Sequence, residues 1–165
     1  MESHRGFLVL FVLALLVSTL ATVYNIVSVA DIRSSTDPTV TSAQNKQFSA
    51  IALGLNLLAW VAIIVSIGLA FSESAKAVQM RKYVGVVVLS FIAMLLVLAS
   101  SILLFIAVQS VNQSAAQLSY VYEISAGVFG IITAFLLLIA FFWGVRGLSP
   151  KMASAKRSPR RSASM

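Results

Sequence analysis

Long apolar runs fill most of this chain and are separated by short polar segments. Each of the four runs holds at least 25 residues, whereas about 20 apolar residues suffice for a helix that crosses the hydrocarbon of a bilayer. Backbone polar groups inside lipid must be bonded within the segment, and none of the runs alternates in polarity as a barrel strand does. We therefore predict four transmembrane helices, at about Gly6–Ala30, Phe48–Ser72, Tyr83–Gln109 and Ser119–Val145.

The connections between the runs are too short to hold a folded domain outside the membrane. Short connections make successive helices antiparallel neighbours. The fold class is therefore an all-α integral membrane protein, an up-down-up-down bundle of four transmembrane helices over residues 1–148, followed by a basic Ser/Pro/Arg tail at 149–165.

Small residues recur within the runs at intervals of three and four. Close packing and interhelical hydrogen bonds hold helices together in lipid, so small residues mark the faces that meet. A 3.5-residue repeat also predicts a left-handed bundle. We interpret these stripes as packing faces, represented by Ala14, Ser18 and Ala21 in the first run and by the seam Ala126, Gly130 and Ala134 in the fourth.

Lysine and arginine are distributed unevenly between the two predicted sides of the membrane. The side that holds both termini carries ten of the twelve cations, and the other side carries only Arg33 and Lys46. Basic flanks face the cytoplasm. We expect both termini on the cytoplasmic side or its topological equivalent. The first run could instead be a secretory signal ending near Ala21, but its apolar stretch continues to Ala30.

Composition narrows the function classes. Of the 165 residues, 59% are hydrophobic and only 10% are charged, against roughly 25% charged residues in soluble domains. The chain has no cysteine and one histidine. It carries no phosphate-binding loop, no nucleophile with a histidine partner and no metal-ligand cluster. We therefore expect neither an enzyme nor a cofactor, and the lipid bilayer is the first predicted partner.

Glu123 is the one ionisable residue within an apolar run. A charge inside the membrane is costly and is a functional hypothesis by default. The predicted topology places Glu123, Asn25 and Asn56 in the same half of the membrane, so the three could form an intramembrane polar cluster. This cluster would serve a proton or cation site in a small channel or transporter subunit. The alternative is a carboxylate near the interface with two amides that support packing.

The tail concentrates positive charge, because six of the twelve cations follow residue 145. Its candidate contact residues are Lys151, Lys156, Arg157, Arg160 and Arg161. Three partners remain open: anionic lipid headgroups, nucleic acid, or a protein with an acidic surface. The Ser158-Pro159-Arg160-Arg161 segment is similar to the repeated basic units of histone and protamine-like tails.

The span pattern together with the tail from Lys156 to Ser164 resembles virion membrane proteins of large icosahedral DNA viruses of algae. The resemblance implies a component of the virion's internal membrane or of its minor capsid layer. We therefore expect a non-enzymatic structural protein that anchors a bilayer to other protein subunits of a large assembly. The alternatives are the Glu123-dependent channel or transporter subunit and an accessory subunit of a cellular membrane complex.

Overall fold

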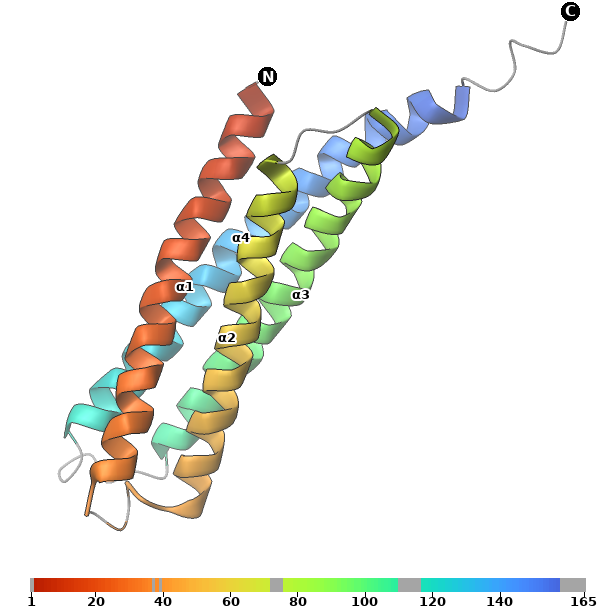
Figure 1. The fold of residues 1–165 in the computed structure, drawn as a ribbon. Coiled ribbons are helices and arrows are strands. Elements are labelled where there is room, and N and C mark those ends of the chain that lie inside the picture. The colour runs from red at the N-terminus through yellow and green to blue at the C-terminus, as the bar shows by residue number, and fades with distance from the viewer. Residues whose placement is uncertain (1, 37, 39, 72–75, 110–116, 158–165) are drawn as a thin grey trace, which may run out of the picture.

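Four long helices form the structure. The computed structural model describes residues 2–36, 38, 40–71, 76–109 and 117–157, with side-chain surroundings for Gly6 and for residues 8–36, 38, 40–70, 83–109 and 120–146. The helices lie side by side as a bundle, and successive helices run in opposite directions (Figure 1). The predicted all-helical, four-helix class is confirmed. The helices are α1 (Glu2–Ser34), α2 (Ala43–Phe71), α3 (Lys76–Gln109) and α4 (Gln117–Arg157).

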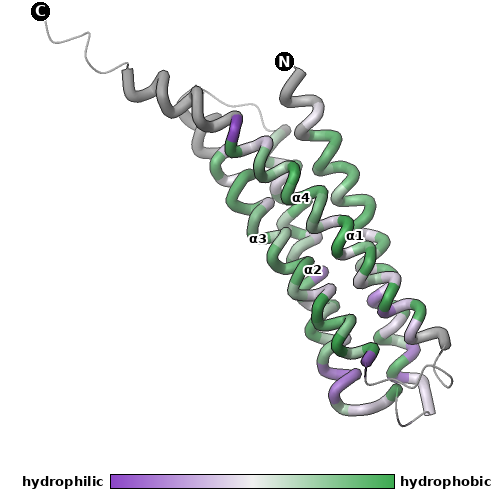
Figure 2. The backbone as a smooth tube through the Cα atoms, turned by 180° about the vertical axis from the view of Figure 1, so that it is seen from behind, coloured by the Kyte–Doolittle hydropathy of each residue, from purple (hydrophilic) through white to green (hydrophobic). Residues whose placement is uncertain are grey.

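Each helix contains a stretch that is long and apolar enough to cross a membrane, and large apolar side chains point away from the bundle. Leu16, Leu58 and Phe135 are 58%, 60% and 62% exposed. Hydrophobic positions cover most of each helix in Figure 2. Soluble proteins rarely expose continuous apolar surface of this extent, which supports the prediction of a multi-pass membrane protein. The four stretches are Leu8–Ser34, Ala43–Ala70, Tyr83–Gln109 and Tyr120–Arg146.

The helices form a closed ring. α1 packs against α2 and α4, and α3 packs against the same two helices. α2 and α4 therefore lie diagonally opposite each other. The contact between α1 and α2 is the least extensive of the four helix pairs, and a cleft opens there.

Buried residues recur at intervals of three and four along every helix. On α2 and α4 the repeat is unbroken over seven positions, and alanine, serine and glycine dominate it. Small side chains let helix backbones approach closely in lipid. The left hand that such a repeat favours stays a prediction. The buried positions are Asn45, Ser49, Ala52, Asn56, Ala59, Ile63 and Ser66 on α2, and Glu123, Ala126, Gly130, Thr133, Leu137, Ala140 and Gly144 on α4.

Interactions at both ends hold the connection between α1 and α2. The Ser42 hydroxyl accepts a hydrogen bond from the Asn45 backbone N–H (3.2 Å), which caps the start of α2. The Asn45 side chain donates to the Val40 carbonyl oxygen (2.9 Å). Val40 is buried against Ile32 near the end of α1. These contacts fix the start of α2 relative to the end of α1.

α4 continues beyond the point where the sequence predicts a tail. The expected boundary lies after residue 148, but the helix runs to Arg157 and includes Pro150. Proline lacks the N–H that would bond to the Arg146 carbonyl, yet alanine, lysine and arginine after it favour helix. Polarity locates the end of the membrane span and not the end of the helix. Figure 1 shows this last part of α4 projecting beyond the bundle.

Candidate functional site

The three residues of the predicted polar cluster are all buried. Glu123 and Asn25 are 0% exposed and Asn56 is 2% exposed. They belong to the buried positions that recur at intervals of three and four on α4, α1 and α2, respectively. All three therefore lie inside the bundle and not on its lipid-facing surface.

Glu123 is bonded to a serine that sequence reasoning did not single out. The Ser49 hydroxyl on α2 donates a hydrogen bond of 2.5 Å to Glu123 Oε1 on α4. Because α2 and α4 are diagonal partners, this bond crosses the interior of the bundle. The Ser28 hydroxyl on α1 also faces the carboxylate. Neither that hydroxyl nor Glu123 Oε2 reaches hydrogen-bonding geometry with a protein partner.

The two asparagines do not join this arrangement through hydrogen bonds. Both polar side-chain atoms of Asn25 and the Nδ2 atom of Asn56 lack a partner. Asn56 is seven residues after Ser49, which places it about 10 Å further along the helix at a rise of 1.5 Å per residue. The predicted cluster of Glu123, Asn25 and Asn56 is thus not a single hydrogen-bonded group. The polar side chains that face Glu123 are those of Ser49 and Ser28.

A signal for Ser49 existed in the sequence. Ser49 precedes Ala52 by three residues and Asn56 by seven, so it continues the stripe of small residues on α2. The stripe extends further to Asn45, whose Oδ1 lies 3.4 Å from the Ser49 hydroxyl. The predicted span begins at Phe48, so Ser49 lies at its edge.

A cleft between α1 and α2 leads to this polar layer. It has a volume of about 230 Å³ and Ser49 forms part of its lining. The other lining residues are Val29, Ile32, Arg33, Lys46 and Ala50. Ser49 therefore links the surface cleft to the buried Glu123.

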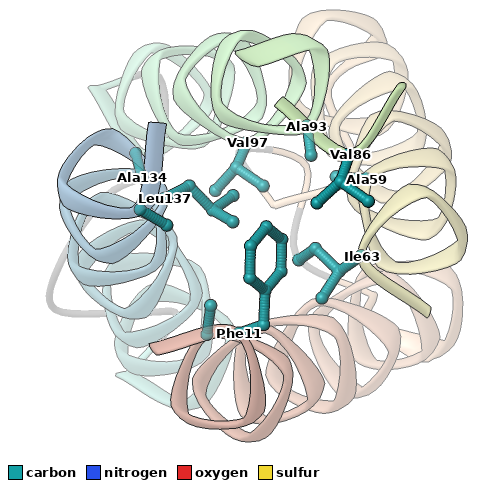
Figure 3. Packing of buried hydrophobic residues seen from close by; sticks show 10 residues of the cluster. Phe11, Ala59, Ile63, Val86, Ala93, Val97, Ala134 and Leu137 are labelled. Carbon is teal, nitrogen blue, oxygen red and sulfur yellow. The ribbon is translucent and has the colours of Figure 1, made fainter. Parts of the chain in front are cut away.

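The other half of the bundle is closed by apolar side chains. Phe11, Ile63, Val97 and Leu137 come from four different helices and point toward one another at the centre (Figure 3). Each of these side chains is at most 1% exposed. This apolar layer lies between the polar residues around Glu123 and the end of the bundle at which α1 begins.

The predicted packing residues all lie in the interior. Ala14, Ser18 and Ala21 on α1 are at most 1% exposed, and Ala126 and Ala134 on α4 are 0% and 6% exposed. Gly130 is also buried, and a Cβ atom there would collide with the Ser101 hydroxyl on α3. Gly130 thus faces α3, where the absence of a side chain permits a close approach.

Only part of the predicted basic contact set lies within the described residues. Lys151, Lys156 and Arg157 belong to the helical backbone of α4. Arg160 and Arg161 lie outside the described residues. The structure places the first three on one helix that continues from the fourth candidate span.

Within the described part of the chain, no group of three or more His, Cys, Asp or Glu side chains could hold a metal ion. Comparison with protein-family models, with curated protein sequences and with solved structures gives no match.

Proposed function

We propose that this chain is a non-enzymatic structural membrane protein that anchors a bilayer to a larger assembly through its basic C-terminal segment. The observation that carries the proposal is the length of α4. Its candidate span ends at Arg146, and residues 147–157 add about 16 Å of helix at 1.5 Å per residue. A helix that leaves the membrane with cations along it is suited to contact a partner away from the bilayer.

The interior of the bundle supports an anchor more than a pathway. Phe11, Ile63, Val97 and Leu137 fill the centre of one half, and an apolar constriction is a barrier to ions. The helices contact one another through buried small residues and contact lipid through apolar ones. The groups that remain for recognition are the cations of the C-terminal segment.

The orientation and the biological setting are part of the proposal. Ten of the twelve cations belong to the side of the two termini, which supports placing both ends at the cytoplasmic face or its equivalent. The resemblance to virion membrane proteins of algal DNA viruses favours the internal membrane or minor capsid layer of a virion. The tail would then contact capsid protein, anionic lipid or packaged nucleic acid.

Truncation after Pro150 tests the anchor. The truncated and full-length chains are extracted in mild detergent and sedimented through a density gradient. The anchor predicts that the truncated chain keeps the four spans folded, losing only the helix after Pro150, but leaves the fast-sedimenting assembly. A variant with Lys151→Arg and Lys156→Arg keeps the charge and should sediment with the full-length chain. Unchanged sedimentation of the truncated chain would contradict the proposal.

A second candidate is a channel or transporter subunit that uses Glu123. The favouring observation is that Ser49 both lines the cleft and bonds Glu123, which gives the buried carboxylate a route to the surface. Flux measured in proteoliposomes separates the two functions. The transporter predicts flux in the natural chain that falls to background in Glu123→Gln, whereas the anchor predicts background flux in both.

A further inference from the structure

The cleft between α1 and α2 combines charge and apolar surface in an arrangement that the anchor does not use. Its volume is about 230 Å³, well above the roughly 30 Å³ occupied by one water molecule in the liquid. It lies at the end of the bundle opposite the two termini, where the α1 span ends at Ser34 and the α2 span begins at Ala43. It therefore opens at the level where lipid headgroups meet the hydrocarbon.

Two cations from different helices line this cleft. Arg33 lies in the last turn of α1 and Lys46 in the first turn of α2, and both side chains are exposed. They are the only two lysines or arginines that the sequence assigns to this side of the membrane. The positive dipole of the α2 N-terminus is opposed by the negative dipole of the α1 C-terminus at the same cleft, and Asp31 lies two residues before Arg33. Two cations against one carboxylate leave this end of the two helices with net positive charge. The electrostatics of the cleft therefore favour an anion.

The rest of the lining is apolar. Val29, Ile32 and Ala50 complete the wall, and Ser49 supplies the one hydroxyl. A free anion gains nothing from such a wall, whereas a phospholipid presents a phosphate next to its glycerol and acyl chains. In the cleft, Arg33 and Lys46 lie beside an apolar wall. The cations match the phosphate of a phospholipid, and the wall matches its glycerol and acyl chains.

We propose that this cleft binds an anionic phospholipid, with Arg33 and Lys46 holding its phosphate and the apolar wall contacting its glycerol and upper acyl region. Guanidinium and ammonium groups both bind phosphate through charge-assisted hydrogen bonds. The bound lipid fills the gap left by the limited contact between α1 and α2. The proposal depends on the membrane location of the bundle and not on the C-terminal segment.

Native mass spectrometry of the full-length chain in detergent tests the site, with phosphatidylglycerol and phosphatidylcholine of identical acyl chains as probes. One phosphatidylglycerol molecule should bind in preference to phosphatidylcholine. Each of Arg33→Gln and Lys46→Gln should weaken phosphatidylglycerol binding about 5-fold, the effect of one cation near anionic lipid. Equal affinity in the natural chain and in the double variant overturns the proposal.

Four further measurements test the specificity of the site. Ala50→Phe leaves the charge unchanged but fills the cleft, so it should weaken binding of both lipids. Arg146→Gln removes an exposed cation at the end of the fourth span, on the other side of the bundle from the cleft, and should leave the affinity unchanged. The charge-retaining pair Arg33→Lys and Lys46→Arg should bind as the natural chain does. If millimolar inorganic phosphate displaces phosphatidylglycerol completely, the cleft binds free anions and the lipid assignment is wrong.

Discussion

Ser49 on α2 and Glu123 on α4 are joined by a hydrogen bond of 2.5 Å across the interior of the bundle. The two helices are diagonal partners in the ring of four. The bond gives Glu123, the one acidic residue within the four predicted apolar runs, a partner within the protein. It also offers a structural reason for Glu123 that needs no transported ion.

If Glu123 is structural, its shape and acceptor oxygen matter more than its charge. Glu123→Gln keeps both and should change the unfolding temperature in detergent by no more than a few degrees. Glu123→Ala removes the partner of Ser49 and leaves a buried cavity, which we expect to cost about 2 kcal/mol or more. Thermal unfolding followed by circular dichroism measures both. A large loss for Glu123→Gln would show that the carboxylate itself is required.

Gly130 has a closer neighbour than Gly54 or Gly127 does. An added Cβ would collide with the Ser101 hydroxyl, which itself bonds the Val97 carbonyl oxygen at 2.9 Å. Gly130→Val should therefore push α3 and α4 apart and destabilise the fold by about 1–3 kcal/mol. Gly54→Val is the matched control, because nothing lies within 4 Å of the added atom. Equal stability of the two variants would contradict the close α3–α4 contact.

Phe11 and Phe135 offer a matched pair for the apolar layer. Phe11 is 1% exposed and fills the centre, whereas Phe135 is 62% exposed on the outer surface. Phe11→Ala should cost about 3–5 kcal/mol through the cavity it leaves. Phe135→Ala should change stability little, since that side chain faces lipid. Similar unfolding temperatures for the two variants would mean that the centre is not packed as described.

The orientation is testable because the natural chain has no cysteine. Gln44→Cys places one thiol at an exposed position near the start of α2, and Ser154→Cys places one near the end of α4. In intact cells a membrane-impermeant maleimide should label only Gln44→Cys. Ser154→Cys should react only after permeabilisation. The reverse pattern would invert the proposed topology.

The small residues singled out in the first and fourth runs lie in the interior, because a repeat at intervals of three and four is a local property of the sequence. The sequence did not predict the partner of Glu123. The residue that meets the Glu123 carboxylate depends on how far α2 and α4 are shifted relative to each other along the bundle axis. The three connections between the helices together determine that shift. Asn25 and Asn56 share the correct face but lie at other heights, so they form no bond to the carboxylate.

The helical extension of α4 is a different case. Polarity predicts a basic tail after residue 148 but does not decide whether that segment is helical. Helix propensity after Pro150 and continuity with a long span outweigh one missing hydrogen bond. The cleft between α1 and α2 was not predictable at all, since it arises from the unequal packing of helix pairs.

Sedimentation of a full-length chain in which only charge is removed tests the central claim most directly. In one variant Lys151, Lys156, Arg157, Arg160 and Arg161 are all replaced by glutamine, and in the other only Glu123→Gln is made. The account predicts that the first variant leaves the large assembly with its bundle intact and that the second remains within it. Retention of the first variant, or loss of the second, would contradict a function located in the C-terminal segment.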